Sequence, residues 1–156
     1  MGSECTIRRG CATPLQSAAR RALGTASEGK CGGAPAALAN SHLTGRYDLA
    51  HLQAFHRFVF GDLYSWAGQV RTITISKGES MFCLPQYIDG YAADIATPLA
   101  RQDHLTGLDR PAFLDGLAEL WADLNALHPF REGNGRATRA LLSQLARDAG
   151  HPIACA

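Results

Sequence analysis

In four separate stretches of the chain, apolar residues recur at intervals of three and four positions, and this spacing restricts the fold more than any other feature. The stretches run over 48–68, 85–99, 109–127 and 134–150. Such spacing places the apolar side chains on one face of an α-helix. Residues 70–76 instead alternate β-branched and polar side chains, and turn residues at 77–80 lead to a second apolar run at 81–83. That pattern predicts a short β-hairpin.

The residues at the ends of these stretches agree with helices. The first helix is predicted to begin after Asp48, whose carboxylate can cap it, and to continue to Gly68, so that Leu63 and Trp66 complete its apolar face. Asp109 is placed to cap the third helix in the same way. Because a two-stranded hairpin is only marginally stable alone, it should lie on the helices as a flap. The sequence predicts an all-α, mainly helical domain with one β-hairpin flap.

The first forty residues differ in composition from the rest. Residues 1–40 contain five basic and two acidic residues, a net charge of +3, whereas 41–156 contain ten basic and twelve acidic residues, a net charge of −2. The leading segment is rich in Gly, Ala and Ser and has no helical stripe. It is predicted to be a disordered tail before a domain at 41–156. An organellar transit peptide is an alternative that its Gly-Gly and Pro content disfavours.

The composition excludes several classes of protein. The 156 residues carry 15 Lys and Arg against 14 Asp and Glu, so the formal net charge is +1 and there is no general basic field for nucleic acid. The sequence contains no run of 18 apolar residues and no secretory signal pattern, which predicts a cytoplasmic protein without a membrane contact. Delivery into another cell is left open. Five cysteines without a C-x-x-C pair and six histidines without H-E-x-x-H disfavour a metal cage made of protein ligands alone.

The segment HPFREGNGRATR, residues 128–139, combines groups that suit a phosphate site. Gly133 and Gly135 open the N-terminus of a helix, where free N–H groups and the helix dipole favour an anion. The Asn134 amide can add a donor. Arg136 and Arg139 are three residues apart on one helical face, so both guanidinium groups can reach the same polyphosphate.

Two further groups in this segment suggest phosphate chemistry rather than binding alone. Glu132 would repel phosphates unless a cation lies between them, and Mg²⁺ is commonly held by one or two carboxylates together with substrate phosphates and water. His128 titrates near neutrality, which suits a base that removes a proton from an attacking hydroxyl. A base, a metal ligand and an anion cradle are therefore predicted within twelve residues.

The same segment is a complete match to the pattern H-x-F-x-(D/E)-G-N-G-R-x-x-R, and in this respect the chain resembles the Fic family. Upstream segments resemble the helix and flap that precede the motif in that family: 47–52, 60–68, 71–72 and 76–78. The resemblance covers about residues 44 to 150. It implies adenylyl transfer, in which AMP passes from ATP to a Ser, Thr or Tyr hydroxyl of a target protein.

The resemblance also implies a role for particular residues. His128 would be the general base, Glu132 would hold Mg²⁺ against the α- and β-phosphates, and Phe130 would anchor the loop in the core. The implied nucleotide-binding residues come from the flap, the loop and the last helix: Lys77, Gly78, Gly133, Asn134, Gly135, Arg136 and Arg139. Arg139 would hold the γ-phosphate, and the segment Ile73–Ile75 would offer a strand edge to the target protein.

The chain departs from the family in its regulation. Many Fic proteins carry an inhibitory helix with the pattern (S/T)-x-x-x-E-(G/N), whose Glu pairs with the second Arg of the motif. The nearest string here is TASEG at 25–29, but Gly24 stands where Ser or Thr is required, and six residues follow Gly150. We therefore expect a separate antitoxin-like protein to supply the inhibitory Glu beside Arg139, as in a toxin and antitoxin pair.

Two alternatives to AMP transfer remain at this point. One branch of the family transfers a different phosphate-containing group and phosphorylates its target, but that branch departs from the Gly-Asn-Gly-Arg pattern that is intact here. A non-catalytic helical binding module is the second alternative, which the complete set of polar groups disfavours. Relatives of similar length modify type II topoisomerases, so DNA gyrase and topoisomerase IV are the first candidate targets.

Overall fold

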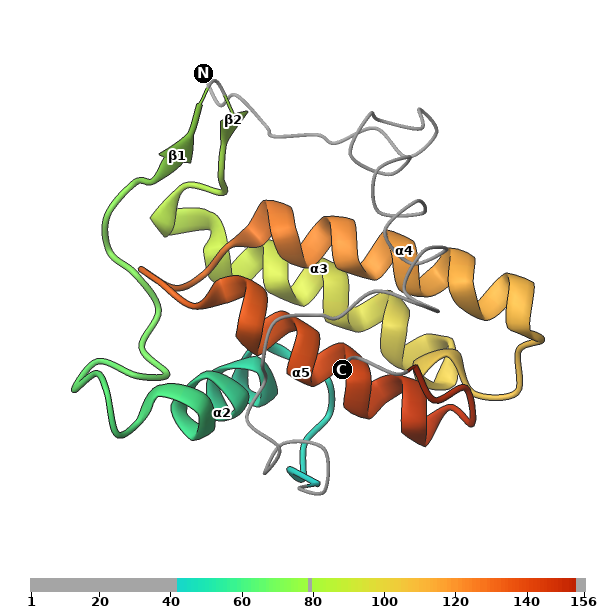
Figure 1. Ribbon diagram of the computed structural model, residues 1–156. Coiled ribbons are helices and arrows are strands. Elements are labelled where there is room, and N and C mark those ends of the chain that lie inside the picture. Colours follow the sequence, from blue (N-terminus) through green and yellow to red (C-terminus); the bar gives the residue numbers. More distant parts are fainter. Residues whose placement is uncertain (1–41, 79, 154–156) are drawn as a thin grey trace, which may run out of the picture.

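The computed structural model describes residues 42–78 and 80–153, and the predicted tail at 1–40 lies outside them. Four α-helices make up most of the described part, as predicted (Figure 1). They are α2 (Leu49–Phe60), α3 (Ile88–Arg101), α4 (Arg110–Leu127) and α5 (Asn134–Asp148). Asp109 caps α4, because its Oδ1 accepts a hydrogen bond of 2.9 Å from the Ala112 N–H. Within the described residues, no helix is long and apolar enough to cross a membrane.

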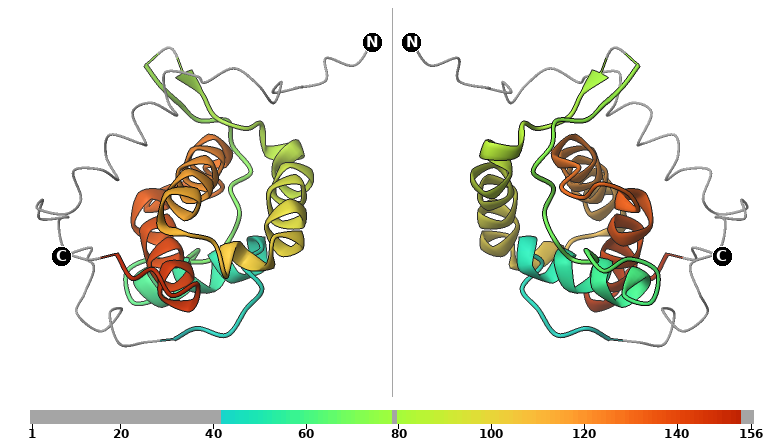
Figure 2. Two further views of the ribbon diagram at one scale, coloured as in Figure 1. Left: turned by 90° about the vertical axis from the view of Figure 1, so that its right-hand side faces the viewer. Right: turned by 90° about the vertical axis from the view of Figure 1, so that its left-hand side faces the viewer.

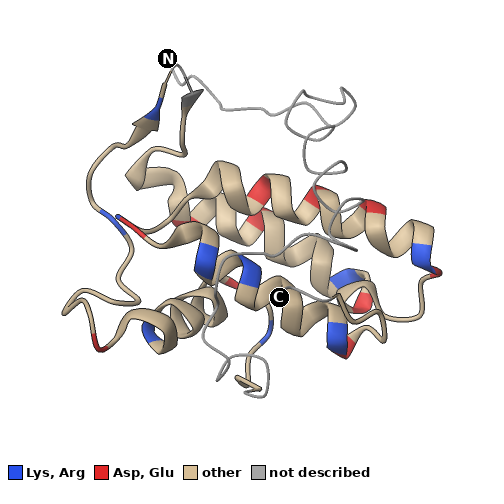
Figure 3. Ribbon diagram, in the orientation of Figure 1, with Lys and Arg blue, Asp and Glu red and all other residues tan. Residues whose placement is uncertain are grey.

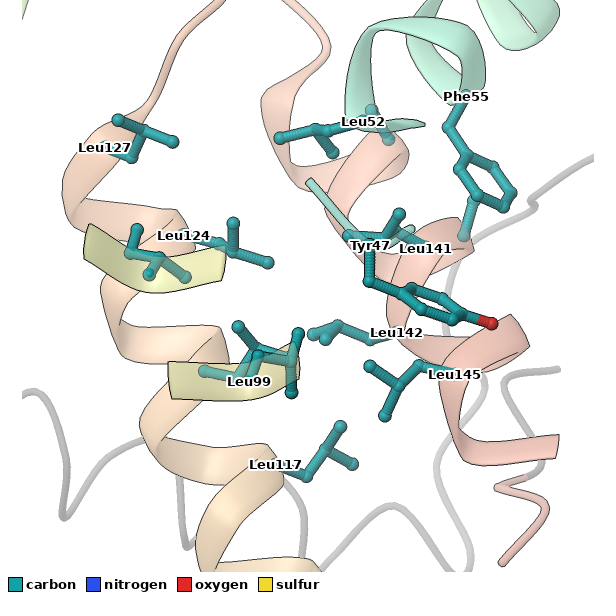
Figure 4. Close-up of a cluster of buried hydrophobic side chains, with 14 of the residues drawn as sticks. Tyr47, Leu52, Phe55, Leu99, Leu117, Leu124, Leu127, Leu141, Leu142 and Leu145 are labelled. Atoms are coloured by element: carbon teal, nitrogen blue, oxygen red, sulfur yellow. The ribbon is translucent and has the colours of Figure 1, made fainter. Parts of the chain in front are cut away.

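α5 lies in the middle of the fold. Nine of its 15 residues are buried, and it packs against α2 on one side and α4 on the other, while α3 packs on α4. Leucines from α3, α4 and α5, among them Leu99, Leu124 and Leu142, converge on one apolar cluster (Figure 4). Burial of such side chains is the main term that holds helices together. The predicted apolar faces of these three helices are therefore confirmed.

The predicted hairpin is present, but its strands are shorter than the sequence pattern indicated. β1 (Ser76–Lys77) pairs antiparallel with β2 (Ser80–Met81), and the hairpin projects beyond the helices (Figures 1 and 2). Residues 70–75 lie outside this ladder and run beside the loop that joins α4 to α5, where the Arg71 N–H donates to the Pro129 carbonyl at 2.9 Å. Short 3₁₀ turns at Pro85–Tyr87 and Asp103–Leu105 precede and follow α3.

The first predicted helix is wrong at its C-terminal end. α2 ends at Phe60, not at Gly68, and residues 61–68 fold back as turns. Gly68 donates its N–H to Nδ1 of His56 at 2.9 Å, which draws the chain back over the helix. Leu63 is left exposed, and the Trp66 ring stacks on Tyr64 with centroids 4.4 Å apart. The apolar spacing persisted past Phe60 because these aromatic residues pack on one another in a non-helical loop.

The segment before α2 is fastened to the end of α5 by a buried histidine and its neighbours. His51 accepts the Tyr47 N–H at Nδ1 (3.2 Å) and donates from Nε2 to the Leu43 carbonyl (2.8 Å). Gln144 of α5 exchanges two hydrogen bonds of 2.8 Å with the Leu43 backbone, and the Tyr47 hydroxyl donates to Asp148. Both ring nitrogens of His51 are therefore used by a neutral imidazole.

This arrangement predicts that the protein loses stability in mild acid. Burial lowers the pKa of His51 in the folded chain, whereas the unfolded chain protonates near pH 6.5. The contribution of His51 to the free energy of unfolding is thus fully present above about pH 6.5. As the pH falls from there through the lower folded pKa, this contribution is lost, by at most about 1.4 kcal/mol per pH unit. Urea denaturation of the wild type and His51→Gln at pH 7.5 and 5.5 measures it. An equal loss of unfolding free energy in both proteins would contradict this prediction.

Candidate functional site

The loop between α4 and α5 is built by residues with unusual backbone angles. His128 ends α4 in the left-handed region (φ 44°, ψ 61°), and Gly133 begins α5 with φ 79°. The Asn134 side chain closes the loop, because its Oδ1 accepts the Phe130 N–H at 2.8 Å and its Nδ2 donates to the Phe130 carbonyl at 2.7 Å. The Phe130 ring is fully buried. The loop is therefore held in one shape by a side chain at its end and a ring beneath it.

Gly133 approaches α2 too closely for any side chain. A Cβ atom placed on Gly133 would lie 2.4 Å from a ring carbon of Phe60. The same Phe60 ring also supports Arg136, whose guanidinium carbon lies 4.4 Å from the ring centroid. Glycine at 133 thus lets the loop and Arg136 pack on one aromatic ring.

The start of α5 is arranged for an anion. The first N–H groups of a helix have no partner within it and carry the positive end of the helix dipole. Arg136 is exposed, and the Arg139 guanidinium lies beside Gly135, since a Cβ there would be 3.6 Å from Nη1. Figure 3 shows basic positions along the first half of α5. The Asn134 amide, in contrast, is engaged by the Phe130 backbone and shapes the loop.

Glu132 is a single exposed carboxylate at the mouth of this cradle. Its Oε1 accepts the Gly133 N–H at 3.0 Å and lies 3.9 Å from Nη2 of Arg136. In the part of the chain that the structure describes, no group of three or more His, Cys, Asp or Glu side chains could hold a metal ion. The donor set therefore fits Mg²⁺ in the manner of one carboxylate completed by substrate phosphates and water, and not as a protein cage.

Within the described residues, one ring nitrogen of His128 has a hydrogen-bond partner and the other has none. Nδ1 lies 3.3 Å from the Asn125 carbonyl, which makes Nδ1 the protonated nitrogen and leaves a lone pair on Nε2. Burial is the main cause that lowers the pKa of His128, and the positive charge of Arg71 acts in the same direction. The imidazole is therefore neutral at pH 7, the form that can accept a proton. A shallow hollow between α4 and α5 is lined by His128, Asn134 and Gly135 among others, so the structure brings these residues together.

The flap lies at the same end of the fold. Lys77 pairs with Ser80 in the hairpin, and Gly78 forms the turn with φ 61°. The flap, the end of α4 and the start of α5 share one side of the molecule (Figure 1). Ile73 is exposed beside the hairpin, whereas Ile75 is half-buried.

Comparison with known proteins agrees with this geometry. The Fic/DOC family model matches residues 46–146. The chain belongs to the Fic/DOC family. It is 45% identical over 116 residues to Protein adenylyltransferase VbhT of Bartonella schoenbuchensis, covering 74% of this chain and 24% of that protein. It is 46% identical over 110 residues to Probable protein adenylyltransferase y4lH of Sinorhizobium fredii, covering 70% of this chain and 57% of that protein.

The fold of this chain is also similar to that of a solved Fic domain. The solved N-terminal Fic domain of a VirB-translocated effector protein from Bartonella sp. AR 15-3 superposes with a TM-score of 0.68 at 24% identity, covering 90% of this chain and 65% of that chain. This similarity confirms the Fic fold. The matched region spans less than two thirds of the length of VbhT and y4lH.

Arg71 supports the loop between α4 and α5, a role that the sequence did not predict. Its buried guanidinium donates from Nε to the His128 carbonyl at 2.8 Å, from Nη1 to the Ile73 carbonyl at 2.7 Å, and from Nη2 to the Cys83 carbonyl. Ile73 and Cys83 stand at the two arms of the flap. One side chain thus joins both arms to the residue that ends α4. No local pattern around Arg71 encodes these partners.

His56 is the second supporting residue that was missed. It is completely buried, accepts the Gly68 N–H at Nδ1, and donates from Nε2 to the Glu132 carbonyl at 2.9 Å. Its ring lies 4.0 Å from that of Phe130. Residues 52, 56 and 60 are spaced by four on α2, and the apolar residues at both ends of this series could have placed His56 on the buried face.

The contact between Gly133 and Phe60 predicts a large effect of a single methyl group. Gly133→Ala should lower the free energy of unfolding by roughly 2 to 4 kcal/mol, because it adds both left-handed backbone strain and overpacking. Gly90→Ala is the matched control, since a Cβ there meets no atom within 4 Å inside α3. It should raise stability by up to about 1 kcal/mol. Urea denaturation measures both, and similar values for the two variants would refute the close contact.

Proposed function

We propose that this chain is a protein adenylyltransferase, which transfers AMP from ATP to a Ser, Thr or Tyr hydroxyl of a target protein. The observation that carries this proposal is the neutral His128 imidazole, with its Nε2 lone pair available, beside the anion-binding start of α5. The names of the relatives VbhT and y4lH support the same activity. Proton acceptance and phosphate binding at one place are what nucleotidyl transfer to a hydroxyl requires.

Each group of the site has its own role in the proposed transfer of AMP. The first N–H groups of α5, with Arg136 and Arg139, bind the phosphates of ATP, and Lys77 and Gly78 of the flap border the nucleotide. Glu132 would hold Mg²⁺, which when bound supplies positive charge that offsets the charge developing on the phosphate oxygens. Nε2 of His128 takes the proton of the target hydroxyl, whose oxygen forms a bond to the α-phosphorus. The bond from the α-phosphorus to the β-phosphate oxygen breaks, and pyrophosphate leaves.

The flap supplies a surface for the target. Its β1 strand has an unpaired edge in the described part of the fold, because the sheet contains only β1 and β2. An extended target segment can add to such an edge through backbone hydrogen bonds. The exposed Ile73 offers an apolar contact beside it. We propose that the target hydroxyl reaches His128 in this way, and that DNA gyrase and topoisomerase IV are the first targets to test.

Removal of the imidazole tests the reaction. His128→Ala should lower the rate of AMP transfer by about 100-fold or more, while ATP binds with nearly unchanged affinity, because the phosphate-binding groups remain. The measurement is label on a protein band after incubation with ATP and Mg²⁺ in a bacterial lysate. Label should come from α-labelled ATP and not from γ-labelled ATP.

The control is His42→Ala, the same substitution at an exposed histidine, which should transfer AMP at the wild-type rate. Label from γ-labelled ATP alone would mean phosphorylation of the target. ATP left unchanged by the wild type would indicate a binding module. Undiminished transfer by His128→Ala would remove His128 as the base.

We further propose that the activity is toxic and that a separate antitoxin restrains it by placing a Glu beside Arg139. In the described residues, the ion pairs involve Arg46, Arg136 and His42, and none involves Arg139. Arg139 is half-buried next to Gly135, so its guanidinium has a defined position where an incoming carboxylate could meet it. Such a pair would occupy the group that we assign to the γ-phosphate.

Toxicity can be measured by growth. Induced expression of the chain alone should arrest a bacterial culture, because an unrestrained transferase would modify an essential protein, and His128→Ala expressed at the same level should not. Colony counts after induction, with protein levels compared by immunoblot, give the result. Equal growth with the wild type and the variant would show that the chain is not a toxin for that host.

A further inference from the structure

The flap carries an aromatic side chain that lies flat on His128. The ring of Phe82, the residue that follows β2, stacks on the imidazole with centroids 3.8 Å apart and ring planes within 13° of parallel. Within the described residues, Phe82 has one contact with another ring, and it is this stack on His128. Phe82 is half-buried and stands outside the apolar cluster of the helices. Filling of the core therefore does not explain its position.

His128 needs such a partner, because little else fixes its ring. Its backbone is left-handed, and the one hydrogen bond of its ring to the described residues, from Nδ1 to the Asn125 carbonyl, is 3.3 Å long and exposed to solvent. An N–H···O bond is ordinarily about 2.9 to 3.0 Å. A long bond at one ring nitrogen leaves the imidazole free to turn about its side-chain torsions. A parallel ring against its face removes that freedom.

Phe82 can do this because its backbone is held most firmly at the residue that follows it. The Phe82 N–H donates to the Ile75 carbonyl across the flap at 3.4 Å, and the next residue, Cys83, donates its N–H to the Ala126 carbonyl at 3.0 Å. Ala126 lies in the last turn of α4, two residues before His128. The Cys83 carbonyl in turn accepts from Arg71, which also binds the His128 carbonyl. The end of the flap at 82–83 and His128 are thus held by the same two groups, the last turn of α4 and the Arg71 guanidinium.

We propose that Phe82 is a positioning residue for His128, whose stacked ring holds the imidazole in the orientation that directs Nε2 toward the target hydroxyl. This inference rests on the proposed function for its catalytic consequence. It assigns the flap a second task, because the element that offers an edge to the target also orients the base. A ring face against the imidazole leaves the Nε2 edge open and shields one face from water.

The stack has a spectroscopic signature that does not depend on activity. The imidazole protons of His128 lie over the face of an aromatic ring and should resonate upfield of those of an unstacked histidine at pH 8, where histidines are neutral. The signal is assigned by its loss in His128→Ala. Phe82→Leu removes the ring but keeps an apolar side chain and should move the signal downfield, whereas Phe82→Tyr keeps the ring and should leave it in place.

Kinetics then tests the consequence. Phe82→Leu should lower the rate of AMP transfer at saturating ATP by about 10-fold or more, because a misplaced base loses part of its effect. Its KM for ATP should be unchanged, since Phe82 is outside the phosphate cradle. Phe82→Tyr should retain the wild-type rate. Phe58→Leu, the same substitution at an exposed ring on α2, is the matched control and should change neither the rate nor the signal.

The outcomes separate the two proposals. A wild-type rate in Phe82→Leu, or a His128 signal that does not move in that variant, would overturn the positioning role. A rate lost equally in Phe82→Leu and Phe82→Tyr would also overturn it, because the stack would not be what matters. A wild type that labels no protein would overturn the proposed function instead, while the NMR comparison would still test the stack.

Discussion

The burial of α5 between α2 and α4 fixes the direction in which its first amide groups point. Nine buried residues hold this helix in the middle of the domain, so its N-terminus has little freedom to tilt. The loop before it is then closed by Asn134 and anchored by Phe130. The anion cradle is therefore not a mobile loop placed on a scaffold. It is the end of the core helix itself, and Arg136 and Arg139 belong to the same rigid element.

Three histidines have a lowered pKa, and their hydrogen bonds distinguish the two that support the fold from the one that suits catalysis. His51 and His56 are buried, and each uses both ring nitrogens to bind backbone groups. His51 binds Tyr47 and Leu43 just before α2, and His56 binds Gly68 and Glu132. His128 is half-buried, and within the described residues its ring has one hydrogen bond, at Nδ1. The number of engaged nitrogens, rather than burial or pKa alone, distinguishes the imidazole that can accept a proton from the two that connect backbone segments.

The parts of the fold that could be predicted from the sequence are those in which local spacing encodes the outcome. α4 and α5 have apolar residues at helical intervals with a cap or a glycine at their ends, and the motif lies in one short segment. α2 was predicted too long, because its continuing apolar spacing came from aromatic residues that pack in a turn. Arg71 and His56 could not be assigned a role, since the partners that connect them to the loop before α5 are backbone carbonyls 57 and 76 residues away. Backbone carbonyls carry no sequence signal.

The ring of Phe60 links the structural requirements of positions 133 and 136. A side chain at 133 would strain the left-handed backbone and would also require a smaller residue at 60. That second change would remove the aromatic surface under Arg136. No substitution at 133, alone or paired with one at 60, preserves both the close approach of Gly133 to Phe60 and the contact of Phe60 with Arg136. The support of Arg136 by Phe60 thus adds a second reason for glycine at 133, besides the left-handed backbone. Redesign of this loop must therefore include Phe60 of α2.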